Sequence, residues 1–143
     1  MRLSHVKQHV VRGFTLIEVM VVVVILGILA AMIVPKLMSR PDEAKIVRAK
    51  QDIMTLESAL DLYRLDNGFY PSQNQGLEAL VSPPSTAPTP QHWKQGGYIK
   101  RLPLDPWGRA YEFRNPGVHH EIDIFSLGPQ GREGESNEIG NWE

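Results

Sequence analysis

Few residues in this 143-residue sequence have the type and spacing that catalysis requires. Ser126 lies in Phe-Ser-Leu-Gly and lacks the Gly-x-Ser-x-Gly turn that exposes a serine nucleophile. His119 and His120 are adjacent and follow the turn sequence Pro116-Gly117, with no third ligand at a spacing typical of zinc. We therefore read both histidines as exposed loop residues.

Three carboxylates in the same region are the remaining candidates for acid-base chemistry. Each lies beside a turn or on a short strand, where solvated carboxylates are ordinary: Asp105, Glu121 and Asp123. There is no cysteine, which excludes a thiol nucleophile, a thiolate metal site and a disulfide. The sequence thus favours a protein that is not an enzyme.

Glu18 is the most informative ionisable residue, because it is the single charge in the apolar stretch from Phe14 to Val34. As a helix this stretch would reach roughly 31 Å, the thickness of a bilayer hydrocarbon core. A carboxylate there costs about 2.5–3.5 kcal/mol on insertion scales. Glu18 either extends to the headgroups or pairs with a cation from another chain, since the stretch itself contains no Lys or Arg.

The apolar stretch must be distinguished from a removable secretory signal, which also follows a basic leader. It is longer than the apolar core of about 7–15 residues in such signals, and Leu29-Ala30-Ala31 makes a poor cleavage site. A helix stop at Pro35 suits a retained anchor, because proline lacks the N–H for the helical ladder. Basic residues flank both ends, so the charge rule alone does not fix the orientation.

The residues at the start of the anchor resemble the class III leader junction of type IV pilins and pseudopilins. They form a basic leader ending in Gly, then Phe, three further residues, and Glu before the apolar helix: Arg12-Gly13-Phe14-Thr15-Leu16-Ile17-Glu18. The resemblance implies that a prepilin peptidase cuts after Gly13 on the cytoplasmic side and methylates Phe14. The cation for Glu18 is then the Phe14 amine of a neighbouring subunit.

Several further motifs resemble the major pseudopilin of type II secretion systems over nearly the whole mature chain. They are Leu65-Asp66-Asn67-Gly68-Phe69-Tyr70-Pro71, Gln75-Gly76-Leu77-Glu78-Ala79-Leu80, Leu102-Pro103-Leu104-Asp105-Pro106-Trp107-Gly108, Phe125-Ser126-Leu127-Gly128 and Ile139-Gly140-Asn141-Trp142. The resemblance implies a subunit that polymerises into a periplasmic pseudopilus and drives protein export. An adhesive or motility pilin is the alternative.

The implied partners are other copies of the chain, minor pseudopilins, the prepilin peptidase and N-methyltransferase, and the inner-membrane assembly platform with its ATPase. The implied location is the bacterial inner membrane, crossed once, with the N-terminus cytoplasmic before cleavage and the C-terminal domain periplasmic. Nucleic acid is not expected as a partner. Without the leader cations Arg2, Lys7 and Arg12 the chain carries a net charge of −4, whereas phosphate binding needs a basic face.

The body should have an α+β fold of the pilin kind, with a long N-terminal helix packed on a small antiparallel sheet. A cleaved leader is expected at 1–13, a transmembrane and filament-core helix at 14–35, and a periplasmic domain at 36–143. The amphipathic half of the helix, about 42–67, carries apolar residues at spacings of three and four: Ile46, Ala49, Ile53, Leu56, Leu60 and Tyr63. Whether Pro35, a candidate assembly residue, kinks one helix or divides two stays open.

Local patterns in the rest of the body predict its smaller elements. A short helix is expected over Gln75 to Val81, and a proline-rich loop over 82–90. Alternation predicts strands at Tyr111–Phe113 and Ile122–Phe125, with a turn at 105–108 leading into the first. Asn67-Gly68 should end the helix in a left-handed cap.

The resemblance also suggests a Ca²⁺ site in the loop after Ser126-Leu127-Gly128, built from main-chain carbonyls and carboxylates. The candidate ligands are the carbonyls of Leu127 and Ser136, the amide oxygen of Gln130 and the carboxylate of Glu138. Gln130 stands where the family usually has Asp, and the loop is a few residues shorter. The alternative is an acidic, glycine-rich surface loop that holds no metal.

Processing at the junction gives the first testable prediction. Gly13→Val should leave a full-length, membrane-inserted precursor that does not assemble, because the peptidase needs a small residue at the scissile bond. Intact mass of the mature wild-type protein should begin at Phe14 and include one added methyl group. A mature start near Met32 would contradict a retained anchor.

Overall fold

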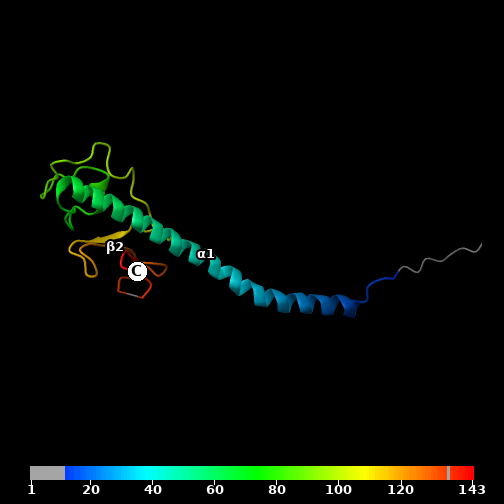
Figure 1. Cartoon of the computed structure of the whole chain (residues 1–143). Coiled ribbons are helices and arrows are strands. Elements are labelled where there is room, and N and C mark those ends of the chain that lie inside the picture. Colours follow the sequence, from blue (N-terminus) through cyan, green and yellow to red (C-terminus); the bar gives the residue numbers. More distant parts are fainter. Residues whose placement is uncertain (1–11, 135) are drawn as a thin grey trace, which may run out of the picture. The chain divides into compact units, whose positions relative to one another are not determined.

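The structure is a computed structural model that describes residues 12–134 and 136–143, without the side chains of 34–40. The predicted leader cations Arg2 and Lys7 lie outside the described residues. Helix α1 runs from Leu16 to Asn67 and includes Pro35. The described chain divides into two compact units between Arg40 and Pro41, and Figure 1 shows α1 contributing to both.

The first unit contains the apolar part of α1. Leu16–Ile33 is one segment long and apolar enough to cross a membrane, with a mean hydropathy of 3.0 and no buried residue. Apolar side chains therefore face outward all round this helix, as expected of a segment surrounded by lipid or by other apolar helices. In such surroundings the helix satisfies its own backbone hydrogen bonds, so its β-branched valines are tolerated.

The second unit is an α+β body, as predicted. Three short strands, β1 (Glu112–Arg114), β2 (Asp123–Ser126) and β3 (Ile139–Gly140), form an antiparallel sheet in the order β1-β2-β3. Phe113 pairs with Ile124, and Phe125 pairs with Gly140. The predicted strands were right in type, with bounds displaced by one residue. The two-residue strand β3 was not predicted.

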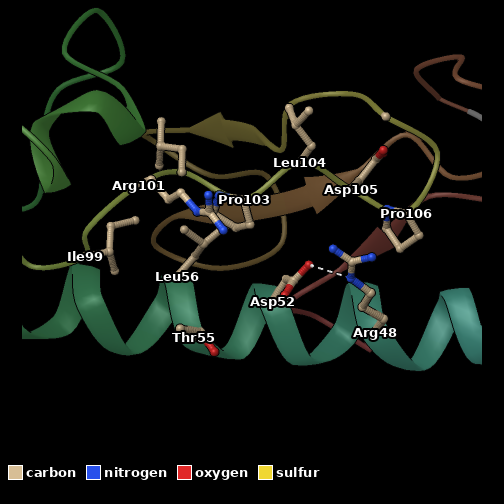
Figure 2. Close-up of a pocket in the computed structure, with 12 residues that line it drawn as sticks. Arg48, Asp52, Thr55, Leu56, Ile99, Arg101, Pro103, Leu104, Asp105 and Pro106 are labelled. Atoms are coloured by element: carbon tan, nitrogen blue, oxygen red, sulfur yellow. Dashed lines mark ion pairs between the residues drawn. The ribbon is translucent and has the colours of Figure 1, made fainter.

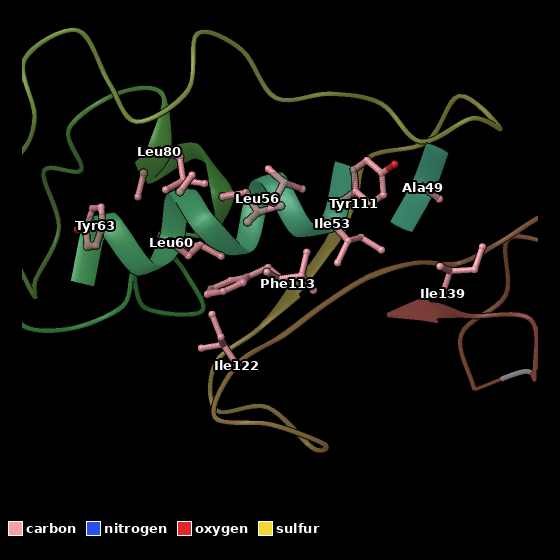
Figure 3. Close-up of a cluster of buried hydrophobic side chains, with 14 residues drawn as sticks. Ala49, Ile53, Leu56, Leu60, Tyr63, Leu80, Tyr111, Phe113, Ile122 and Ile139 are labelled. Atoms are coloured by element: carbon pink, nitrogen blue, oxygen red, sulfur yellow. The ribbon is translucent and has the colours of Figure 1, made fainter. Parts of the chain in front are cut away.

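One face of α1 packs on this sheet and supplies six of the 14 buried residues in the core cluster (Figure 3). Its buried residues follow the predicted spacing of four and three: Ala49, Ile53, Leu56, Leu60 and Tyr63. From the other side the core receives Phe113, Ile122, Ile124 and Ile139. Ile46 departs from the prediction because it is 37 % exposed, one turn before the sheet begins to cover the helix.

The segments after α1 are held by turns and side-chain hydrogen bonds. Gly68, with a φ of 84°, ends the helix and donates from its N–H to the Arg64 carbonyl at 2.7 Å, which confirms the predicted left-handed cap. The predicted helix over Gln75 to Val81 is only a 3₁₀ turn, Leu77–Leu80. The proline-rich loop is irregular as predicted, and buried Gln75 donates to the Thr86 carbonyl at 2.6 Å and the Pro88 carbonyl at 3.0 Å.

The hydroxyl of Tyr63 is the exception to good polar pairing in the core. Tyr63 is 0 % exposed, and its hydroxyl has no hydrogen-bond partner among the described residues. Burial raises the pKa of Tyr63, so the hydroxyl stays neutral. An unpaired buried hydroxyl opposes folding, because its bonds to water are lost without replacement.

Tyr63→Phe should therefore raise the stability of the chain, by about 1 kcal/mol. Tyr111→Phe is the matched control, because the buried Tyr111 hydroxyl donates to Asp52 at 2.8 Å and its removal should cost about 1.5–3 kcal/mol. Thermal unfolding of the detergent-solubilised chain measures both. Equal losses in the two variants would mean that the Tyr63 hydroxyl has a partner, such as an internal water.

Candidate functional site

The junction before α1 brings three of the predicted site residues close together. Gly13, Phe14 and Glu18 line one small cavity with Arg12. Phe14 is 86 % exposed, and Gly13 has open space where a β-carbon would stand. The cleavage position predicted from the sequence thus lies in an exposed segment without regular secondary structure, immediately before the helix.

Glu18 belongs to a capping box that the sequence interpretation missed. The Thr15 N–H donates to the Glu18 carboxylate at 3.4 Å, and the Glu18 N–H donates to the Thr15 hydroxyl at 3.3 Å. This reciprocal arrangement satisfies donors that the first helical turn leaves unpaired. The signal was present in the sequence as Thr-x-x-Glu before an apolar run. The box gives Glu18 a hydrogen bond but no counter-charge.

A groove of about 730 Å³ runs beside α1 in the second unit (Figure 2). Its two carboxylates, Asp52 and Asp105, are both hydrogen-bonded, whereas Arg101 on its lining has no partner among the described residues. Asp52 accepts the hydroxyl hydrogen of Tyr111 and lies 3.9 Å from Arg48. Burial and the nearby Asp52 carboxylate raise the pKa of Tyr111, which keeps it protonated. These contacts hold the Asp52 side chain in place and join α1 to Tyr111.

Asp105 is buried, so the prediction of a solvated carboxylate at this position was wrong. Its carboxylate accepts hydrogen bonds from the N–H groups of Trp107 at 3.0 Å and Arg109 at 2.7 Å. It also accepts from the buried hydroxyl of Ser126 at 2.7 Å. Asp105 therefore closes the predicted turn and joins it to the end of β2.

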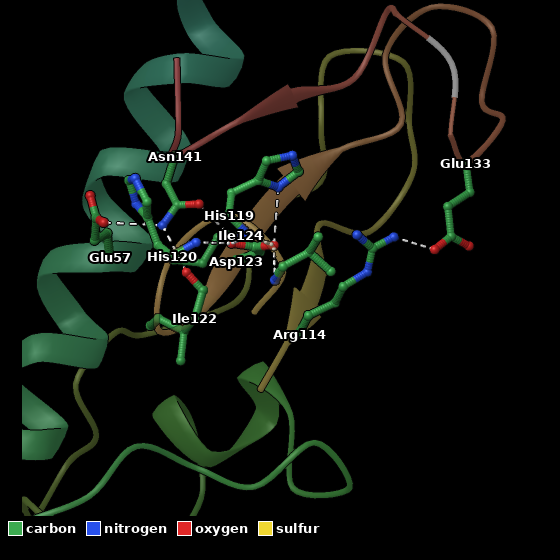
Figure 4. A network of polar contacts seen from close by, with 10 residues as sticks. Glu57, Arg114, His119, His120, Ile122, Asp123, Ile124, Glu133 and Asn141 are labelled. Atoms are coloured by element: carbon green, nitrogen blue, oxygen red, sulfur yellow. Dashed lines mark hydrogen bonds and ion pairs between the residues drawn. The ribbon is translucent and has the colours of Figure 1, made fainter. Parts of the chain in front are cut away.

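Asp123 is buried too, at 0 % exposure, while Glu121 is exposed as expected and pairs with Arg64 at 2.7 Å. The Asp123 carboxylate accepts the N–H of Val118 at 2.7 Å, of His119 at 3.1 Å and of His120 at 3.0 Å (Figure 4). Burial alone would raise the pKa of Asp123, but these bonds and the His119 ring together lower it.

The adjacent histidines are exposed, as predicted, but His119 has a defined position. Its Nδ1 lies 3.2 Å from the Asp123 carboxylate, and its ring stacks on Trp142 with centroids 3.9 Å apart. Trp142 in turn covers Phe125 on β2. Among residues 12–134 and 136–143, no group of three or more His, Asp or Glu side chains is arranged to hold a metal.

Comparison with known proteins places this architecture in a family. Residues 36–142 match the family described as "Type II secretion system (T2SS), protein G", and residues 9–34 match the "Prokaryotic N-terminal methylation motif". The chain belongs to the type II secretion system protein G family. The motif spans the predicted junction at Gly13 and Phe14, and fits a membrane-anchored pseudopilin.

Relatives of this pseudopilin cover nearly its whole length. The type II secretion system core protein G of Pseudomonas aeruginosa is 57 % identical over 134 residues, covering 92 % of this chain and 94 % of the relative. That of Vibrio cholerae is 55 % identical over 139 residues, covering 95 % and 94 %. The crystal structure of the major pseudopilin of enterohaemorrhagic Escherichia coli superposes with a TM-score of 0.70 at 51 % identity, covering 76 % and 95 %.

These relatives identify the chain as a structural pseudopilus subunit of type II secretion, and an adhesive pilin is not favoured. Pro35, the other predicted assembly residue, lies within α1, so the chain remains helical through it. Its role stays a prediction, as do cleavage after Gly13 and methylation of Phe14.

The four predicted calcium ligands of this pseudopilin do not all line one hollow among the described residues. The Glu138 carboxylate accepts the Gly134 N–H at 2.6 Å, and the exposed Gln130 side chain has no hydrogen bond or ion pair to any residue that the structure describes. Ser136 and Glu138 line a hollow with Arg114 and His119, whereas Leu127 and Gln130 do not. Ca²⁺ takes six to eight oxygen ligands, and only two of the four predicted residues, Ser136 and Glu138, border this hollow.

Asp123 gives the prediction for this part of the structure. Because its pKa is lowered on folding, its contribution to stability is present above about pH 4, the unfolded value, and is lost as pH falls through the folded value. Asp123→Asn should remove that acid-dependent loss and cost about 2 kcal/mol or more at neutral pH, since an amide oxygen cannot replace the charge-assisted bonds.

Unfolding curves between pH 2 and 7 measure this effect. Glu121→Gln is the matched control, because its exposed pair with Arg64 should contribute little to stability. An Asp123→Asn variant as stable as the wild type at neutral pH, or equally acid-sensitive, would contradict the role given to this carboxylate.

Proposed function

We propose that this chain is cut after Gly13, is N-methylated at Phe14, and then polymerises into a periplasmic pseudopilus that drives protein export. The observation that carries the proposal is Glu18, the one charged residue in Leu16–Ile33, a helix whose apolar side chains are otherwise exposed. Such a helix needs apolar neighbours, and such a carboxylate needs a cation.

The Phe14 amine of an adjacent copy meets both needs. Cleavage after Gly13 creates this cation four residues before Glu18, and methylation keeps it protonated at neutral pH. Glu18 and Phe14 border the same cavity in the single chain, so both groups are accessible at one end of the apolar helix. Pairing between copies would also set the axial step from one subunit to the next.

The proposed topology has the leader in the cytoplasm, α1 crossing the bacterial inner membrane once, and the body in the periplasm. Partners are copies of the chain, minor pseudopilins, the prepilin peptidase and N-methyltransferase, and the inner-membrane platform with its ATPase. A structural rather than catalytic role is supported by the pairing of Asp52, Asp105 and Asp123, each of which holds a local turn or side chain.

Glu18→Gln separates the two roles of this side chain. A glutamine can still accept the Thr15 N–H in the capping box, but it carries no charge. The variant should be cleaved, methylated and inserted as the wild type is, while filament yield and secretion fall by about tenfold or more, because the amine of the neighbour loses its counter-charge.

Glu43→Gln is the matched control, an exposed glutamate on α1 outside the apolar segment. Intact mass reports processing, membrane extraction reports insertion, and electron microscopy of sheared filaments reports assembly. Normal filament yield in Glu18→Gln would show that the carboxylate serves the helix cap alone.

A further inference from the structure

We propose that the Arg109 guanidinium serves as the cation of the C-terminal loop, residues 127–138, so that this pseudopilin holds the loop without calcium. The Arg109 side chain donates from Nη1 to the Gly128 carbonyl at 2.7 Å and lies 3.5 Å, through Nη2, from the Pro129 carbonyl. Main-chain carbonyl oxygens are also the kind of ligand that binds a hard cation such as Ca²⁺. Here a protein cation already engages two of them.

The backbone around Arg109 is fixed before its side chain reaches the loop. Asp105 binds the Arg109 N–H through its carboxylate at 2.7 Å, and its own N–H donates to the Arg109 carbonyl at 2.7 Å. The same carboxylate accepts from Ser126, whose hydroxyl oxygen accepts the Gly128 N–H at 3.1 Å. Buried Asp105 thus positions both Arg109 and Gly128, the loop residue whose carbonyl Arg109 binds.

The loop backbone is shaped to admit the guanidinium. Gly131 has a φ of 68°, which only glycine adopts readily, and a β-carbon there would collide with the Arg109 guanidinium. The planar group therefore packs directly against the main chain of Gly131 while it binds the preceding carbonyls. A divalent ion at the same carbonyls would be strongly repelled by the fixed positive charge.

The loop acids that the structure describes are committed elsewhere. Glu133 pairs with Arg114 (Figure 4). The Arg114 guanidinium also lies 4.4 Å from the ring centroid of Phe125. Glu138 accepts the Gly134 N–H at 2.6 Å and closes the far part of the loop. Two arginines from residues 109–114 therefore anchor the loop at separate points, and this anchoring is independent of how the chain assembles.

The test compares calcium binding with loss of the arginine in the full-length mature chain, purified in a non-ionic detergent. Titration calorimetry with CaCl₂ to millimolar concentration should give no binding heat, and the wild-type Tm should be the same with Ca²⁺ and with chelator. A Tm rise of several degrees in Ca²⁺, reversed by chelator, would overturn the proposal even if no arginine variant folds.

Arg109→Gln should lower the Tm by about 4 °C or more. It should also speed hydrogen exchange at residues 128–134 by roughly tenfold relative to the rest of the body, because a loop that has lost its anchor can open without unfolding of the core. Arg109→Lys should recover only part of the effect, since an ammonium cannot lie flat on Gly131 while binding both carbonyls.

Arg101→Gln is the matched control, an exposed arginine without a hydrogen bond or ion pair among the described residues. It should leave exchange in the loop unchanged. Equal loop exchange in Arg109→Gln and Arg101→Gln would overturn the proposal.

Discussion

A single carboxylate in an otherwise apolar helix is the constraint on which the rest of this pseudopilin depends. Among the described residues, Glu18 accepts a hydrogen bond from the Thr15 N–H but forms no ion pair, although Arg12 borders the same cavity. The stretch from Phe14 to Val34 contains no Lys or Arg, so the cation must come from outside it. A charge of this kind persists in a membrane only with a partner. In the proposed assembly, cleavage after Gly13 creates that cation and self-association brings it to Glu18.

The body is held together without a disulfide, since the chain contains no cysteine. Its core is formed by one face of α1 and a sheet of three short strands, and buried polar side chains supply the rigidity between them. Asp105 joins the turn at 105–108 to β2, and Asp123 accepts the N–H groups of the turn that precedes β2. Asn141 donates to Glu57 on α1 and to the Ile122 carbonyl, both at 3.1 Å, and so joins the C-terminus to the helix.

The sequence predicted the elements that depend on local periodicity or on one special backbone conformation. The apolar spacing along α1, the glycine cap at Gly68 and the two longer strands all emerged where expected. Thr15 could also have been found, since Thr-x-x-Glu before a helix is a readable pattern.

The missed features depend on contacts between residues distant in sequence, or on turn geometry. Asp123 is buried because three successive N–H groups of the preceding turn converge on it, which composition does not reveal. Arg109 and Gly131 meet across more than twenty residues. Strand β3 is two residues long, too short for any alternation to be visible.

The pairing between copies can be observed directly in assembled filaments. Subunits labelled with ¹⁵N at the Phe14 amine can be mixed before assembly with subunits labelled with ¹³C at the Glu18 carboxylate, so that any dipolar transfer must cross between chains. Solid-state nuclear magnetic resonance should detect this transfer, because the two charged groups of an ion pair lie within about 4 Å. Well-ordered filaments that show no intermolecular transfer between these two atoms would contradict the account.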